Sequence, residues 1–251
     1  QNFRKNKMKN FLVLSLILVN GIFGFSKTIE VCATCPTKTL KQAFSLTQNG
    51  DEVILKPGVY KEHDIEIFQG VTLKGEGNPI IDGEMAGTIL TIHADSFSIE
   101  GITFKNVGQS YTKDFAAILV KRAKHFRINN NILENVFFGI LVEKSKYGEI
   151  YNNTISGERM KESNSGNGVQ LWHSSNMEIY GNEVYGMRDG LYFEFVDNAN
   201  IYNNNSHHNI RYGLHFMFSN DDTYSNNRFS NNGAGVAVMF SKKIIMHNNV
   251  F

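Results

Sequence analysis

Four side chains in the second half of the chain have the chemistry of soft-metal ligands. His215 and Met217 lie two residues apart, Met239 follows Met217 by 22 residues, and His173 precedes them all. Imidazole nitrogen and thioether sulfur are donors that suit Cu(I). We therefore predict a transient Cu(I) site on these four residues, with His215 as the best single candidate. The alternative is that the methionines only fill gaps beneath a loop or a partner.

The same region carries large side chains that would form a docking surface. Alternate residues of a strand share one face, so Trp172, Glu194, Met217 and Met239 would make one outward column, with Tyr192 beside it. Contiguous exposed apolar patches often mark partner surfaces. We predict that these five residues bind partners and that none is catalytic. The opposite, interior face would hold Leu191, Phe193, Phe195, Leu214, Phe216, Phe218, Val236, Val238 and Phe240.

An internal repeat must position these side chains. It is marked by asparagines that each follow an apolar residue by three, and they recur every 22 or 23 residues except for one interval of 29: Asn131, Asn153, Asn182, Asn204, Asn227 and Asn249. A second series, from Ala117 to Gly235, has the same intervals. The shared long interval places an insertion of about seven residues at 157–163.

Each repeat contains short strand patterns and turns but no segment with helical periodicity. Such a unit fits one coil of a right-handed parallel β-helix, in which equivalent side chains stack at about 4.8 Å. The fold class is therefore all-β, a solenoid with coils of about 22 residues. Residues 39–44 predict a short N-terminal capping helix, and the stacked asparagines are expected to hydrogen-bond along the coils.

The ends of the chain suggest export. Residues 1–7 precede Met8 and are interpreted as not native, and 8–26 have the charged, apolar and small-residue regions of a signal peptide. The β-helix domain would be 27–251, in the periplasm, with its C-terminal end truncated within a repeat. Cys32 and Cys35 form one C-x-x-C, for which a local disulfide is the default over a redox pair or a metal site.

The net charge and the positions of the carboxylates bear on two other functions, nucleic-acid binding and polysaccharide cleavage. A net charge of +1 without a basic cluster argues against a nucleic-acid partner. Polysaccharide cleavage needs two carboxyl groups about 5 to 9.5 Å apart on one face. The candidates are Asp189, Glu194, Asp197, Asp221 and Asp222. Because the Gly-His-Gly and Arg-Ile-Lys segments of polygalacturonases are missing from the sequence, a carbohydrate-binding or carbohydrate-cleaving β-helix is only the alternative, and we predict no enzymatic activity.

Four segments together resemble the NosD family. They are 167–176 (NGVQLWHSSN), 187–195 (MRDGLYFEF), 211–222 (RYGLHFMFSNDD) and 233–241 (GAGVAVMFS). The resemblance implies a periplasmic accessory protein for nitrous oxide reductase assembly that acts with an ABC transporter, its ATPase and permease, in copper supply. It further implies a copper chaperone lipoprotein and the reductase as partners, with membrane contact only through the permease.

Overall fold

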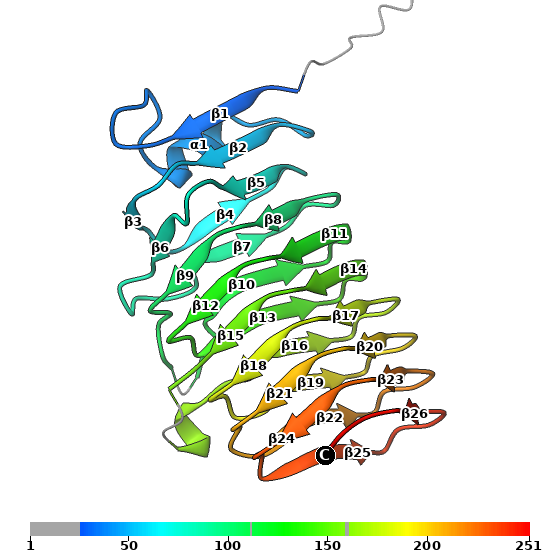
Figure 1. The fold of residues 1–251 in the computed structure, drawn as a ribbon. Helices are drawn as coiled ribbons and strands as arrows, with labels where there is room; N and C mark the ends of the chain where they lie inside the picture. Colours follow the sequence, from blue (N-terminus) through cyan, green and yellow to red (C-terminus); the bar gives the residue numbers. More distant parts are fainter. Residues whose placement is uncertain (1–25, 111, 159–160) are drawn as a thin grey trace, which may run out of the picture.

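The computed structural model describes residues 26–110, 112–158 and 161–251. The expected upstream segment 1–7 and almost all of the signal peptide 8–26 lie outside these residues. Within them, three parallel sheets wind around a common core, and successive coils lie one below another (Figure 1). The all-β, right-handed parallel β-helix predicted from the repeat is confirmed.

Sheet A contains ten strands, all paired in parallel. In spatial order they are β1 (Thr28–Val31), β2 (Glu52–Leu55), β5 (Thr72–Gly75), β8 (Ser98–Glu100), β11 (Lys124–Asn129), β14 (Lys146–Tyr151), β17 (Glu178–Tyr180), β20 (Asn200–Tyr202), β23 (Thr223–Ser225) and β26 (Ile245–His247).

Sheets B and C contain eight strands each. Sheet B is β3 (Val59–Lys61), β6 (Ile80–Asp82), β9 (Thr103–Lys105), β12 (Ile132–Glu134), β15 (Thr154–Ser156), β18 (Glu183–Tyr185), β21 (Asn205–His207) and β24 (Arg228–Ser230). Sheet C is β4 (Ile65–Ile67), β7 (Leu90–Ile92), β10 (Ala116–Lys121), β13 (Phe138–Glu143), β16 (Val169–Trp172), β19 (Leu191–Glu194), β22 (Tyr212–Met217) and β25 (Ala234–Met239).

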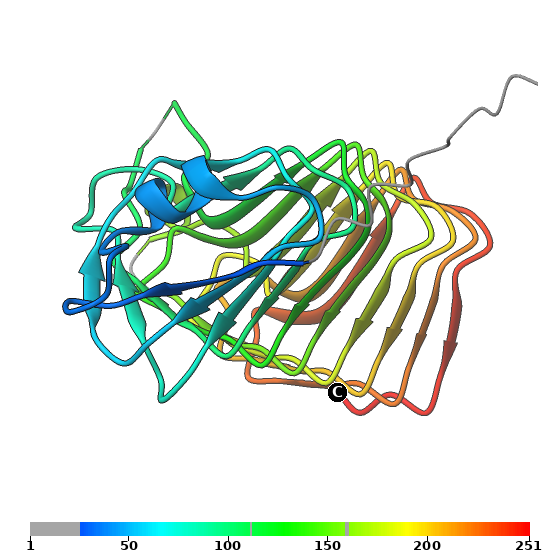
Figure 2. The ribbon, with the colours of Figure 1, turned by 90° about the horizontal axis from the view of Figure 1, so that it is seen from above.

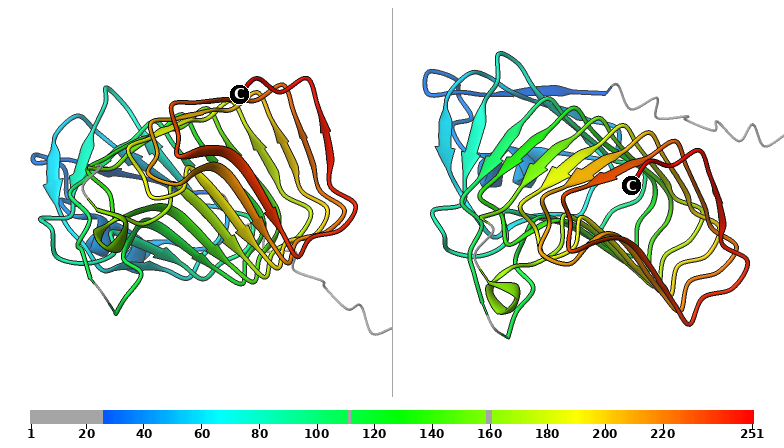
Figure 3. Two further views of the ribbon diagram at one scale, coloured as in Figure 1. Left: turned by 90° about the horizontal axis from the view of Figure 1, so that it is seen from below. Right: turned by 60° about the horizontal axis from the view of Figure 1, so that its bottom comes forward.

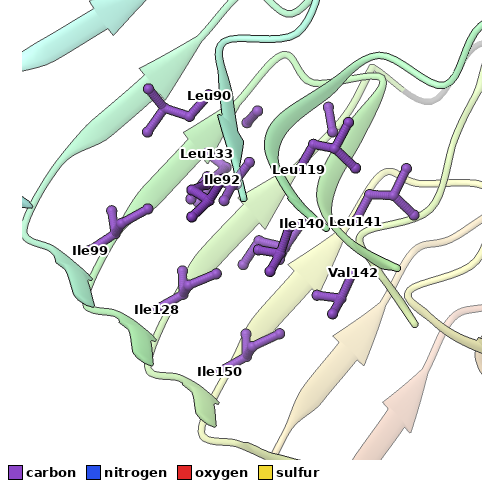
Figure 4. Close-up of a cluster of buried hydrophobic side chains, with 14 of the residues drawn as sticks. Leu90, Ile92, Ile99, Leu119, Ile128, Leu133, Ile140, Leu141, Val142 and Ile150 are labelled. Carbon is purple, nitrogen blue, oxygen red and sulfur yellow. The ribbon is translucent and has the colours of Figure 1, made fainter. Parts of the chain in front are cut away.

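The core is built from equivalent positions of successive coils. Ile99, Ile128 and Ile150 of sheet A form one line of buried side chains, and Ile140 and Val142 of sheet C face the same interior (Figure 4). Stacking β-branched side chains at the spacing of paired strands excludes water along the whole solenoid. Each coil therefore needs its neighbour to bury its apolar face.

An asparagine stack holds one corner of the coils from Asn131 to Asn249. The Nδ2 group of Asn153 donates to Asn182 Oδ1 at 3.0 Å, and Asn182 donates in turn to Asn204 Oδ1 at 3.0 Å. The preceding asparagines, such as Asn152 and Asn203, have φ of 54° and 55° and turn the chain. The expected hydrogen-bonded ladder is confirmed, and the asparagines beside it supply the left-handed corner.

The N-terminal end has the expected short helix, α1 (Leu40–Leu46). Thr39 accepts a hydrogen bond from Gln42 N, and the Glu62 carboxylate accepts from Leu40 N at 2.7 Å. Both contacts satisfy backbone donors that the helix itself leaves free. α1 contacts β1 and β4 and lies at the N-terminal end of the coils in Figures 1 and 2. The expected Cys32–Cys35 disulfide is present in the loop after β1.

Part of the predicted interior face is wrong. Phe195, Phe218 and Phe240 do not enter the core but are 39%, 41% and 76% exposed. Each follows a strand of sheet C at a residue with φ between 50° and 53°, and this turn ends the alternation of side chains on which the prediction depended. Val238 pairs with the buried Phe216 and so lies on the predicted interior face, but it is exposed because it belongs to the last coil that the structure describes.

The insertion between β15 and β16 leaves the coil where the sequence predicted it. It contains the short 3-10 helix η1 (Glu162–Asn164), which projects beside sheet C in both views of Figure 3. Among the described residues, no helix is both long and apolar enough to span a membrane.

Candidate functional site

The outer face of sheet C aligns the predicted docking residues. The strand register pairs Trp172 with Glu194, Glu194 with Met217, and Met217 with Met239. All four side chains are partly exposed, and Lys144 Nζ lies 4.9 Å from the centre of the Trp172 ring. The predicted column therefore exists as one continuous line across β16, β19, β22 and β25.

A second column on this face contains Tyr192, His215 and Ala237 in register. His215 is only 4% exposed, and its Nδ1 lies 3.2 Å from Oδ2 of Asp189, which has no exposed surface. Arg211 donates to both oxygens of the same carboxylate, from Nε at 2.9 Å and from Nη2 at 2.6 Å. Asp189 thus joins a guanidinium and an imidazole within one buried group.

The charges in this group are mutually compensated. Burial alone would raise the pKa of Asp189, but hydrogen bonds from His215 and Arg211 outweigh it and hold that pKa below the usual 3.8. The hydrogen bond to Asp189 also raises the pKa of Arg211. Asp189 is therefore an anion at neutral pH, and its carboxylate accepts a hydrogen bond from Nδ1–H of His215.

This arrangement leaves His215 Nε2 with its lone pair when the ring is neutral. Among the described residues, Nε2 has no hydrogen-bond partner, and it is shielded from solvent. An unsatisfied buried polar atom costs about 1–3 kcal/mol, so its presence calls for a functional reason. A carboxylate that fixes one imidazole nitrogen and leaves the other free is the usual support of a metal-ligating histidine.

Aromatic rings and the insertion enclose this imidazole. The rings of Tyr192 and Tyr212 lie 4.9 and 4.8 Å from that of His215. Tyr192 donates its hydroxyl hydrogen to Glu194 at 3.2 Å, and burial together with the Glu194 charge raises the pKa of Tyr192 to about 12. Glu162 of η1 lies 3.2 Å from Arg211 Nη1, so the insertion reaches the site through an ion pair.

His173 lies elsewhere. It occupies the corner after β16 with φ of 49°, is exposed, and stacks on Phe195 with ring centres 4.5 Å apart. Phe195, Phe218 and Phe240 continue the stack at 5.2 and 5.0 Å. The structure therefore brings His215, Met217 and Met239 to one face but places His173 in a separate column at the corner.

Sequence reasoning did not connect Asp189 and Arg211 to His215. Asp189 was named only among the carboxylates for sugar cleavage, and Arg211 was given no role of its own. The available signal was their position: Asp189 lies one residue before Gly190, and Arg211 lies two residues before Gly213, the equivalent glycine of the next coil. Stacked coils bring such residues side by side. Among the described residues, no three His, Cys, Asp or Glu side chains converge as a metal site, so sulfur donors would have to complete one at His215.

The solved structures that resemble this chain share its fold, but the match covers a different share of each. The catalytic domain of GH87 alpha-1,3-glucanase in complex with nigerose has a TM-score of 0.68 at 12% identity, over 88% of this chain and 45% of that one. XylC with xylose has a TM-score of 0.61 at 10% identity, over 88% of this chain and 70% of that one. At such identities the likeness shows the fold alone.

Sequence relatives point to one family. Residues 151–251 match the family described as "Periplasmic copper-binding protein (NosD)". A "Probable ABC transporter binding protein NosD" of Pseudomonas aeruginosa is 31% identical over 120 residues, which are 47% of this chain and 28% of that protein. A protein of the same description from Stutzerimonas stutzeri is 29% identical over 126 residues, 49% of this chain and 29% of that one.

The matched segment thus spans less than a third of these relatives, yet residues 151–251 include the whole Asp189–Arg211–His215 group and the outer column. The comparisons thus show that residues 151–251, and with them this group, are similar to the NosD family.

Proposed function

We propose that this protein is a periplasmic accessory protein that holds Cu(I) as cargo during nitrous oxide reductase assembly and acts with an ABC transporter. The observation that carries the proposal is the shielded Nε2 of His215, which has no hydrogen-bond partner in the described chain and whose ring Asp189 orients. The family description and the relatives' names support the periplasmic setting and the transporter.

The donor set suits a soft cation. Met217 lies two residues after His215 on the same face of β22, and Met239 is paired with Met217 across β25. Cu(I) prefers thioether and imidazole donors to carboxylates. One nitrogen and two sulfurs from adjacent strands would hold the ion weakly enough for transfer, while the rigid sheet fixes their spacing.

The outer column would present this ion to partners. Trp172, Tyr192 and Glu194 lie on the same face of the preceding strands, and large aromatic residues often anchor protein interfaces. We propose that the permease, a copper chaperone lipoprotein or the reductase docks here. The rigidity of the solenoid would let the docked partner approach the methionines without a change of fold.

Cu(I) titration of the protein against a competing chelator tests the proposal. We expect Met217→Leu/Met239→Leu to weaken binding, because leucine keeps the volume but removes both sulfurs. Asp189→Asn should weaken binding by about 10- to 100-fold, since it removes the charge that orients His215. Met85→Leu, at an exposed methionine, is the matched control. Unchanged Cu(I) affinity in the double variant would leave only a docking role.

The carbohydrate alternative has one observation in its favour, a groove of about 660 Å³ lined by Phe195, Phe218, Phe240, Asp197 and Asp221 among others. Of the other carboxylates proposed for cleavage, Asp189 is ion-paired and Asp222 is buried. We therefore expect that incubation with acidic polysaccharides releases no reducing or unsaturated ends. Their release, and its loss in Asp197→Asn/Asp221→Asn, would favour a polysaccharide-active protein instead.

A further inference from the structure

Two neighbouring histidines converge at the end of strand β21 of sheet B. His207 ends β21, and His208 follows at a corner with φ of 54°. Their Nδ1 atoms are 2.8 Å apart, and the two rings are nearly perpendicular at 87°. Alternation along β21 would point two adjacent side chains to opposite faces, but the left-handed corner at His208 ends the alternation and lets the two rings meet.

The ring of His207 is held on two sides. Its Nε2 lies 3.3 Å from Oε1 of Glu183 on the neighbouring strand β18, and the ring stacks on Tyr185 with centres 5.2 Å apart. A carboxylate only accepts hydrogen bonds, so Nε2 carries the hydrogen and Nδ1 keeps its lone pair in the neutral ring. The side chain of His207 is 18% exposed, which leaves its position well defined but close to solvent.

The distance between the two Nδ1 atoms indicates the coordination geometry that they would give a bound metal ion. Two nitrogens 2.8 Å apart that each bond an ion at about 2.0 Å subtend an angle of about 90° at that ion. This is the angle between adjacent ligands in square-planar or tetragonal coordination, which is typical of Cu(II) and Ni(II) with nitrogen and oxygen donors. Cu²⁺ binds such donors more tightly than the other divalent ions of its series.

We propose that His207 and His208 bind one Cu²⁺ ion through their Nδ1 atoms, with Glu183 as a positioning residue and water at the remaining positions. In the metal-free protein, His208 Nδ1–H donates to His207 Nδ1; on binding, that hydrogen moves to Nε2 of His208, which is exposed. The site does not depend on the proposed Cu(I) function, because it uses other residues, another sheet and another oxidation state of copper.

The sulfur atoms of the chain do not compete with this pair of histidines for Cu²⁺. The chain has two cysteines, and both are in the Cys32–Cys35 disulfide, so no thiolate draws Cu²⁺ away. The thioethers of Met217 and Met239 are soft donors that favour Cu(I) over Cu²⁺. A titration without reductant therefore reports on imidazole sites.

The test is a titration of the untagged chain with Cu²⁺ in competition with glycine, followed by electron paramagnetic resonance of the one-equivalent complex. We expect a tetragonal spectrum with coupling to two imidazole nitrogens. Glu183→Gln should weaken binding by about 10- to 100-fold, and His208→Asn should weaken it further. Asparagine tolerates the positive φ of this corner, so the variant should fold.

His125→Asn is the matched control, because His125 of β11 is also an exposed histidine with a positive φ, of 56°. It should keep the affinity and the spectrum of the unmodified protein. Wild-type Cu²⁺ affinity in His208→Asn would overturn the proposal. Loss of Cu²⁺ in His215→Gln but not in His208→Asn would also overturn it and would place the ion on sheet C, whereas failure of the Cu(I) titration alone leaves the His207–His208 site intact.

Discussion

Replacing Asn182 with alanine should lower the free energy of unfolding by about 4 kcal/mol. The buried Asn182 side chain accepts hydrogen bonds from N and Nδ2 of Asn153, both at 3.0 Å, and donates to Ile150 O at 2.9 Å and to Asn204 Oδ1 at 3.0 Å. Alanine would leave two donors of Asn153 and the Ile150 carbonyl without these partners, and each such buried group costs about 1–3 kcal/mol.

Urea denaturation of the variant beside Asn203→Gly measures this effect. Asn203 precedes the next member of the same ladder, but its side chain is exposed and its φ is 55°. Glycine adopts this conformation readily, so the control should change stability by less than about 0.5 kcal/mol. A loss in Asn182→Ala no larger than that in Asn203→Gly would mean that the side-chain ladder does not stabilise the coils.

The ladder was predictable because a solenoid repeats its geometry. A residue type that recurs every 22 or 23 residues must return to the same place in each coil, so the spacing of Asn131 and Asn153 was enough to infer that they stack. The outer column was predictable for the same reason: once Gly190 and Gly213 fixed the register, alternation placed Glu194 beside Met217 on one face.

Corners were less predictable because their conformation is not periodic along a strand. Phe195 and His208 both adopt positive φ, a conformation that a bulky aromatic or imidazole side chain seldom takes, and sequence alternation carried no sign of it. The contacts of Asp189 with Arg211 and His215 were equally hidden. They join side chains 22 and 26 residues apart, and their meeting depends on rotamers that local patterns do not specify.

The burial of Asp222 was also not predictable from the sequence. From the sequence it was one of the candidate carboxylates for polysaccharide cleavage, but the structure buries it completely in the corner before β23. Its Oδ1 accepts a hydrogen bond from Ala199 N at 2.8 Å, whereas its shielded Oδ2 has no partner in the described chain. Burial raises the pKa of Asp222 to about 7; the Ala199 hydrogen bond opposes this, and the charges of Asp197 and Asp221 add to it.

Because of the Asp222 carboxyl group, the free energy of unfolding should fall as pH rises. The folded protein keeps the Asp222 proton up to about pH 7, while the unfolded chain releases it near 3.8. Between these values the folded state binds more protons, so the contribution is complete below pH 3.8 and is lost as pH rises through 7. At about 1.4 kcal/mol for each pKa unit, the loss is about 4 kcal/mol.

Asp222→Asn isolates this contribution, because asparagine keeps an oxygen for Ala199 N but cannot ionise. We expect the unfolding free energy of the variant, measured in urea, to rise relative to that of the wild type between pH 4.5 and pH 8. The rise should be most of the loss of about 4 kcal/mol given above. Asp221→Asn, at the exposed neighbour paired with Lys243 at 3.1 Å, should retain the fall but move its midpoint slightly lower. A constant difference between Asp222→Asn and wild type across this range would mean that Asp222 is already ionised in the folded protein at pH 4.5, and that its buried oxygen is solvated by water.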